Sequence, residues 1–85
     1  MKVVIRADKE VARFFRHGKR YYGLVSEVVV GQQVELTFMV SDSCNGFVRW
    51  FLMFGDSAEI IEPQSMREEI IKMCEAIMQR VAATK

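Results

Sequence analysis

The sequence has few residues of the kinds that form metal and redox sites, with two cysteines and one histidine, and it has one proline among 85 residues. Cys44 and Cys74 lie far apart, and with His17 they cannot supply the four ligands of a structural zinc site. No apolar run approaches the ~20 residues of a membrane-spanning helix, and no leader segment opens the chain. We therefore predict reduced thiols, no metal, no cofactor, no membrane contact and a cytoplasmic location.

The chain also lacks an excess of charge of either sign. Twelve basic and eleven acidic residues leave a formal charge of +1, so any electrostatic site must be local. A hydrophobic content of 51% with 27% charged residues is typical of a soluble globular protein, and this length predicts one domain spanning residues 1–85. No nucleophile, base and oxyanion donor occur at a suggestive spacing, so we do not expect an enzyme.

Apolar periodicity predicts strands over residues 2–7, 24–30, 34–40 and 58–62. The second and third strands flank "GQQ" and form the clearest hairpin signal. Helices are predicted over residues 9–16, from the "SDS" segment to about residue 54, and from residue 64 to about residue 82. The order is β-α-β-β-α-β with a third helix added at the end. It predicts an α+β, ferredoxin-like sandwich with a four-stranded antiparallel sheet and a C-terminal helix.

Three local details accompany this prediction. Gly55 stands where a helix ends on a left-handed residue, and Pro63 ends the last strand. The third strand alternates apolar residues facing inward with Glu35, Thr37 and Met39 facing outward. The outward side chains of the hairpin are expected to be Glu27, Val29, Glu35, Thr37 and Met39.

A basic and aromatic cluster follows the first strand in the segment "RFFRHGKRYY". Cations interleaved with aromatic rings suit phosphate contacts and base stacking. Equally, basic residues at a helix end can simply complement the helix dipole in solvent. The candidate residues for binding nucleic acid or another anion are Arg13, Arg16, Lys19, Arg20, Tyr21 and Tyr22.

The last helix carries two apolar stripes. The main stripe has core spacing and consists of Met66, Ile70, Met73, Cys74, Ile77 and Val81. A second set, Ile71, Met78 and Ala82, lies beside the first around the helix. It is either the margin of a wide core stripe or a protein interface. We predict self-association, most simply as a homodimer, with Ile71, Met78 and Ala82 in the contact.

The segment "VRWFLMFGDSAEIIEPQSMREEI" resembles the closing signature of the WCX domain, the C-terminal extension of bacterial WYL-type transcriptional regulators. The residues that carry the resemblance are Trp50, Phe51, Leu52, Phe54, Gly55, Ile60, Ile61, Glu62, Pro63, Met66, Arg67 and Glu68. The upstream element order is also similar, so the likeness covers the whole chain.

The resemblance implies a fragment of a longer regulator, whose helix-turn-helix and WYL domains would precede it. That WYL domain is the alternative to a second copy as the partner of Ile71, Met78 and Ala82. Such a module would assist assembly and the sensing of a ligand, which in this family is often thought to be a nucleic acid. Two other hypotheses remain: a free-standing small-ligand sensor of the same architecture, and a single-strand nucleic-acid binder. The second is disfavoured because the expected outward sheet positions lack aromatic residues.

Overall fold

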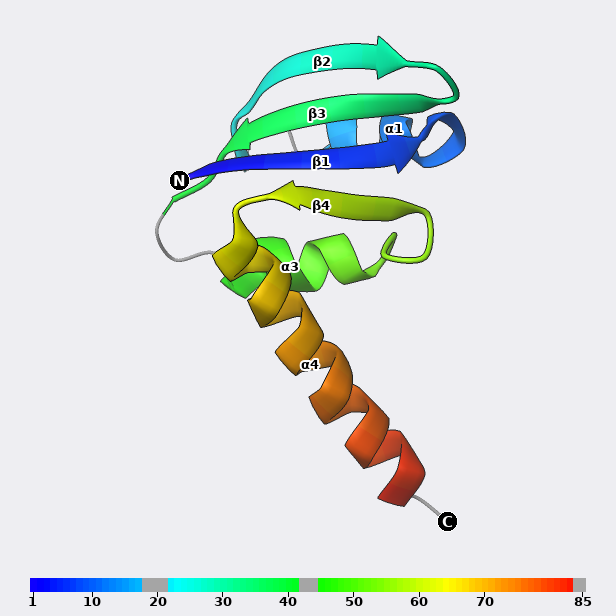
Figure 1. The fold of residues 1–85 in the computed structure, drawn as a ribbon, viewed down its shortest axis with the longest axis vertical. Helices are drawn as coiled ribbons and strands as arrows, with labels where there is room; N and C mark the ends of the chain where they lie inside the picture. The colour runs from blue at the N-terminus through cyan, green and yellow to red at the C-terminus, as the bar shows by residue number, and fades with distance from the viewer. Residues whose placement is uncertain (18–21, 42–44, 84–85) are drawn as a thin grey trace.

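The computed structural model describes residues 1–17, 22–41 and 45–83 of the chain. Four strands and three helices follow one another in the predicted order (Figure 1). Their bounds are β1 Lys2–Asp8, α1 Lys9–Arg16, β2 Leu24–Val30, β3 Gln33–Met39, α3 Asn45–Leu52, β4 Ala58–Glu62 and α4 Gln64–Ala83. The predicted α+β class with a C-terminal helix is confirmed.

The four strands form a single sheet in the order β2-β3-β1-β4, and every pair of neighbours is antiparallel. The predicted hairpin is confirmed: Val30 pairs with Gln33 across a two-residue turn. Gly31 begins that turn at φ +63°, and no non-glycine residue in the described part of the chain has a positive φ. A glycine at the first turn position is typical of a type II′ hairpin, whose twist matches that of the strands.

One face of the sheet is covered by α1 and α3, and the core lies between the sheet and these helices. Alternate residues of β1 and β3 point into it because side chains along a strand alternate between the two faces. Phe15 of α1 lies at its centre, with its ring 5.2 Å from Trp50 and 4.9 Å from Phe54. The buried cluster is Val3, Ile5, Ala7, Ala12, Phe15, Val34, Leu36, Phe38, Val40, Phe47, Val48, Phe51, Ile60 and Met66.

The other face of the sheet carries ion pairs instead of a helix. Arg6 Nη2 lies 3.1 Å from Glu35 Oε2, and Lys2 Nζ lies 3.3 Å from Glu62 Oε1. The pair of Lys2 and Glu62 is exposed, and such pairs contribute roughly 0.2–1 kcal/mol each, whereas the pair of Arg6 and Glu35 is partly buried. Both pairs keep this face of the sheet polar.

The strand register corrects the expected orientation of β2. Val28 pairs with Glu35, so Val28 lies on the open face. Val29 pairs with the core residue Val34 and therefore faces the helix side, as does Glu27 opposite Leu36. A register shift between Leu24 and Ser26 separates this segment from the start of the strand. The sequence alone could not fix this, because a one-residue slip moves every side chain to the other face.

The prediction of a left-handed Gly55 was wrong. Among the described glycines only Gly23 and Gly31 have a positive φ. The chain leaves α3 through successive tight turns instead, with the Gly55 amide donating to the Leu52 carbonyl at 3.4 Å. Gly23 is the glycine that needs its conformation, because an added Cβ would stand 2.6 Å from the carbonyl oxygen of Met39.

Candidate functional site

The most unusual feature of the molecule is α4, which runs past the body of the domain (Figure 1). The helix has 20 residues, which corresponds to about 30 Å. The helix beneath it, α3, has only eight residues and cannot cover that length. Only the beginning of α4 therefore packs, through the buried Met66 and the partly buried Ile70 and Met73.

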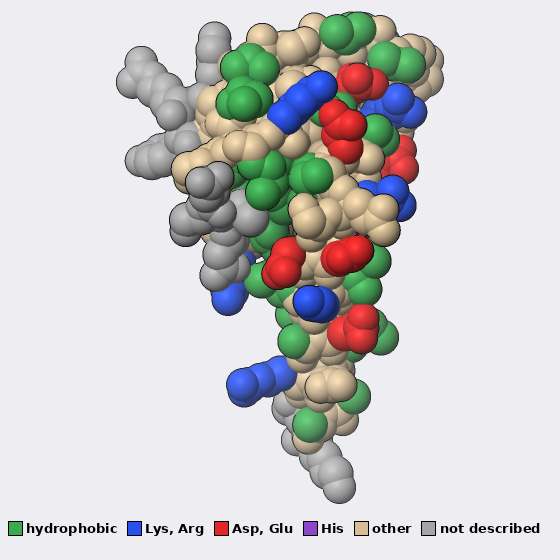
Figure 2. All heavy atoms as spheres, turned by 60° about the vertical axis from the view of Figure 1, so that its left-hand side comes forward, with side chains coloured by type: hydrophobic (Ala, Val, Ile, Leu, Met, Phe, Trp, Pro, Cys, Tyr) green, Lys and Arg blue, Asp and Glu red, His purple; other side chains and the backbone are tan. Residues whose placement is uncertain are grey.

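Beyond the half-buried Cys74 the apolar residues of α4 are exposed, and we call this part of the helix, residues 75–83, the overhang. Ile77 is 47% exposed, Met78 69% and Val81 68%. Figure 2 shows apolar side chains on the surface along this lower end of the molecule, among scattered charges. Large apolar side chains gathered on one surface are typical of interaction sites.

The overhang corrects part of the sequence prediction. Ile77 and Val81 were assigned to the core stripe, but both lie on the surface. Of the predicted interface residues, Ile71 is 56% exposed and Met78 69%. Ala82 is exposed as well. The contrast between a twenty-residue helix and its eight-residue neighbour was the available signal, since the stripe continues after the partner helix has ended.

A hollow of about 320 Å³ lies where the overhang leaves α3. Met73, Ile77 and Val81 form its apolar wall, and Arg49 and Arg80 also line it. Long basic side chains can lie along apolar surface while keeping their charge in water. The hollow thus extends the apolar surface of the overhang towards the body of the domain.

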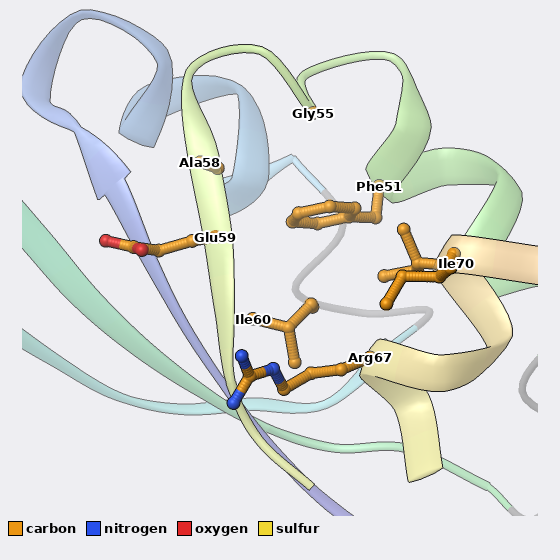
Figure 3. Close-up of a pocket in the computed structure, with 8 residues that line it drawn as sticks. Phe51, Gly55, Ala58, Glu59, Ile60, Arg67 and Ile70 are labelled. Atoms are coloured by element: carbon orange, nitrogen blue, oxygen red, sulfur yellow. The ribbon is translucent and has the colours of Figure 1, made fainter. Parts of the chain in front are cut away.

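A second hollow, of about 240 Å³, lies between β4 and the first turns of α4 (Figure 3). Phe51, Ile60 and Ile70 point towards one another around it, and Arg67 reaches across from α4 towards β4. Glu59 points away from the hollow, on the other side of β4. This hollow is therefore an apolar depression with one basic side chain, that of Arg67, beside it.

The predicted anion-binding residues have different surroundings in the structure. Arg16 is bonded to Glu27 of β2, which raises the pKa of Arg16 because the carboxylate accepts a hydrogen bond from the guanidinium. Arg13 is exposed, and its guanidinium carbon lies 4.8 Å from the centroid of the Phe14 ring. Lys19, Arg20 and Tyr21 lie outside the described residues.

Tyr22 is a packing residue as much as a surface one. Its ring stacks on Trp50 at a centroid distance of 4.7 Å, and its hydroxyl lies 3.4 Å from the carbonyl oxygen of Gly46. Trp50 is confirmed as a packing residue, since five neighbouring aromatic rings surround its indole. Stacking on an external base would have to compete with these contacts.

Two further properties concern the described residues. No three side chains of histidine, cysteine, aspartate or glutamate gather within residues 1–17, 22–41 and 45–83 so as to hold a metal ion. Within the same ranges, none of the helices combines the length and apolar character needed to cross a bilayer.

The fold and this surface define a small α+β domain: a four-stranded antiparallel sheet followed by a long helix that exposes apolar side chains beyond the core. Comparison with known families then gives its identity. The profile of the WCX domain family matches residues 1–78, so the chain belongs to the WCX domain family. No curated protein and no solved structure matches the chain. The resemblance carried by Trp50, Gly55, Pro63 and Arg67 is therefore confirmed.

Proposed function

We propose that this domain is a non-enzymatic regulatory and oligomerisation module of a WYL-type DNA-binding transcriptional regulator. Membership of the WCX family supports this context. We also propose that the fold is ferredoxin-like. The strand order reads β4-β1-β3-β2 from the opposite edge, with two helices on one face, which is the arrangement expected of a β-α-β-β-α-β chain.

The overhang of α4 carries the oligomerisation part of the proposal. Ile71, Cys74, Met78 and Val81 recur at alternating spacings of three and four residues along α4. This is the spacing by which one helix packs its apolar seam against another. The occupant we propose is the overhang of a second copy, related by a two-fold axis, because the same surface on both copies closes a dimer.

The methionine in this seam suits such a contact. Met78 is unbranched and can adapt its side chain to the surface of an opposing helix. A pair of overhangs would remove from water the apolar side chains that are now exposed, at about 25 cal/mol for each Å² of apolar surface buried. The open part of α4 thus has a physical reason to associate.

Sedimentation analysis tests this contact. Met78→Lys combined with Val81→Lys should reduce the average mass of the protein at a fixed concentration, because each pairing would bury uncompensated charges. Met53→Lys is the matched control, since Met53 is 71% exposed but lies in the turn after α3. An unchanged mass in the double variant would refute the α4 contact.

A second candidate function is effector binding at α1, which we propose for a single-stranded nucleic acid. The supporting observation is that exposed Arg13 stands over the ring of Phe14, which stacks on Phe54 at a centroid distance of 5.7 Å but is still 38% exposed, so that a cation and part of an aromatic ring are presented together. Lys19 and Arg20, which follow in the sequence, would add phosphate contacts.

A salt series measures this binding. Changing Arg13, Lys19 and Arg20 together to Ala should flatten the salt dependence of binding by roughly 0.7 for each phosphate that the protein no longer neutralises. Arg67→Ala is a control because Arg67 is an exposed arginine on α4. The same slope in the triple variant and its parent would exclude α1 as the site.

A further inference from the structure

The outer edge of β2 is open, whereas sheets normally protect their edges. Exposed edge strands are usually blunted by proline, lysine, bulges or a covering element. β2 has neither lysine nor proline, and its exposed side chains include Val25 at 62%, Val28 at 53%, Val29 at 65% and Val30 at 43%. Figure 2 shows apolar side chains on the surface at this upper end of the molecule.

The opposite edge has the usual protection. β4 has five residues, its pairing with β1 is shifted at Val4 and Ile5, and Pro63 follows it directly. Glu62 is paired with Lys2, and α4 packs beside the strand. Edge protection is therefore heavier at β4, because among the described residues β2 has only the register shift between Leu24 and Ser26 near its start.

The hydrogen-bonding groups of β2 can be assigned from the ladder. Met1 and Val40 exchange two backbone hydrogen bonds, one of 2.7 Å and one of 2.8 Å. Because successive residues of a strand direct their hydrogen-bonding groups to opposite sides, the even-numbered residues of β3 bond to β1. The odd-numbered residues of β3 therefore bond to β2, where their partners include Val28 and Val30. The backbone N–H and C=O groups of Glu27 and Val29 then point outward from the sheet.

There is also room beside β2 for another strand. Val29 faces the helix side of the sheet but is 65% exposed, so the helical layer ends before it reaches β2. Among the described residues, Arg16 of α1 reaches across from this layer to Glu27. Within the part of the chain that the structure describes, a strand can approach this edge without meeting a helix.

We propose that β2 pairs antiparallel with β2 of a second copy, about a two-fold axis at Val28. The two sheets of four strands would join into one of eight. Three symmetric registers place the outward backbone groups of Glu27 and Val29 opposite the same groups of the second copy. Centring the axis on Glu27 would set two carboxylates opposite each other, which is unfavourable. Centring it on Val29 would pair only residues 28–30 within the strand.

The register centred on Val28 avoids both problems. Residues 26–30 of each copy are paired, and each Glu27 stands opposite a Val29. Val28 meets its own counterpart on the open face. The valines of the two strands would then be partly withdrawn from water, and the outward backbone groups would gain partners.

This contact is separate from the one proposed for α4. β2 and the overhang lie at opposite ends of a molecule 43 Å long (Figure 1). One copy can therefore make both contacts at once. The β2 contact does not depend on the α4 contact, and the two together would give assemblies larger than a dimer.

The position of Val28 on the axis provides the test. In a background of Met78→Lys with Val81→Lys, which removes the α4 contact, sedimentation should show a reversible dimer. Adding Val28→Lys or Val28→Glu should leave a monomer, because two like charges would face each other. An equimolar mixture of the two should regain a dimer, with association at least about tenfold tighter than that of either variant alone.

Two outcomes would overturn the proposal. This register is excluded if the Val28 variants remain dimeric, or if their mixture stays monomeric although circular dichroism shows folded protein. Because Val28 is 53% exposed on the open face, its substitution leaves the core intact. Failure of the α4 contact gives a different result, namely an unchanged mass on introducing Met78→Lys and Val81→Lys alone.

Discussion

The two edge strands of the sheet have similar residues but opposite surroundings. β2 reads LVSEVVV and β4 reads AEIIE, and both are rich in β-branched residues. Ile60 of β4 is 8% exposed, whereas Val29, also on the helix side of its strand, is 65% exposed. The composition of a strand thus indicates that it is a strand, while its burial depends on helices encoded elsewhere.

The same contrast recurs along α4. Met66 at its start is 1% exposed, and Val81 near its end is 68% exposed, although both belong to one apolar stripe. In each case an element with a regular apolar pattern extends beyond what covers it. The centre of the domain is therefore well packed, while apolar side chains remain exposed at its two ends, on β2 and on the overhang.

The largest expected effect compares the two edges directly. Ile60→Ala should destabilise the domain by about 2–5 kcal/mol, because it leaves a cavity in a packed core. Val29→Ala should cost less than about 1 kcal/mol, since its side chain is already in water. Chemical denaturation at a low protein concentration would measure both. Similar losses for the two variants would show that β2 is covered in the native protein.

The next largest effect compares the stability cost of replacing the two glycines that precede the edge strands. Gly23→Ala combines a left-handed φ of +68° with a Cβ 2.6 Å from the Met39 carbonyl oxygen. The left-handed conformation alone costs about 1–2 kcal/mol, and the close approach adds to it. At Gly55 an added Cβ would meet only atoms at 3.7 Å or more. Gly55→Ala should therefore change stability by less than about 0.5 kcal/mol.

Thermal unfolding of these two glycine variants decides between the turn at Gly55 described by the structure and the left-handed turn expected from the sequence. If Gly55→Ala were as costly as Gly23→Ala, the conformation described for Gly55 would be wrong. The midpoint of the parent protein is the reference for both.

Much of the fold followed from local patterns. The strands and helices were predicted within a few residues, because alternation and helical spacing act over short distances. The conformation of Gly55 was missed because a glycine after a helix can end it in more than one way, and the choice depends on how the chain joins β4. The side of β2 was missed because the register shift after Leu24 has no signature in the sequence.

The interaction surfaces were predicted less completely. Ile71, Met78 and Ala82 stood out because they lie beside a core stripe. Ile77 and Val81 did not, since their spacing continues that of Met66 and Ile70. Which part of a stripe is buried depends on the length of the opposing element, α3, and this is a property of tertiary packing. Two sequence positions with the same pattern can therefore differ wholly in exposure.

The smallest expected effect concerns the charged residue of β2. Glu27 is bonded to Arg16, and their side chains are 32% and 49% exposed. At this exposure the pair is screened by solvent, so Glu27→Gln should cost no more than about 0.5 kcal/mol. Glu62→Gln, which weakens the pair of the other edge with Lys2, should cost no more, because those side chains are 51% and 60% exposed.

Salt, and not pH, should reveal the pair of Glu27 and Arg16. The hydrogen bond to Glu27 raises the pKa of Arg16, so the stability linked to Arg16 is fully present below the unfolded pKa. It would be lost only when the pH rises through the still higher folded pKa, and Arg16 stays charged throughout the neutral range. The cost of Glu27→Gln should therefore be constant there and shrink in about 1 M salt, where the screening length is about 3 Å. A cost that persisted in high salt would mean that Glu27 stabilises β2 by packing and not by its charge, whereas a cost that varied with pH near neutrality would show that a group titrating in that range takes part.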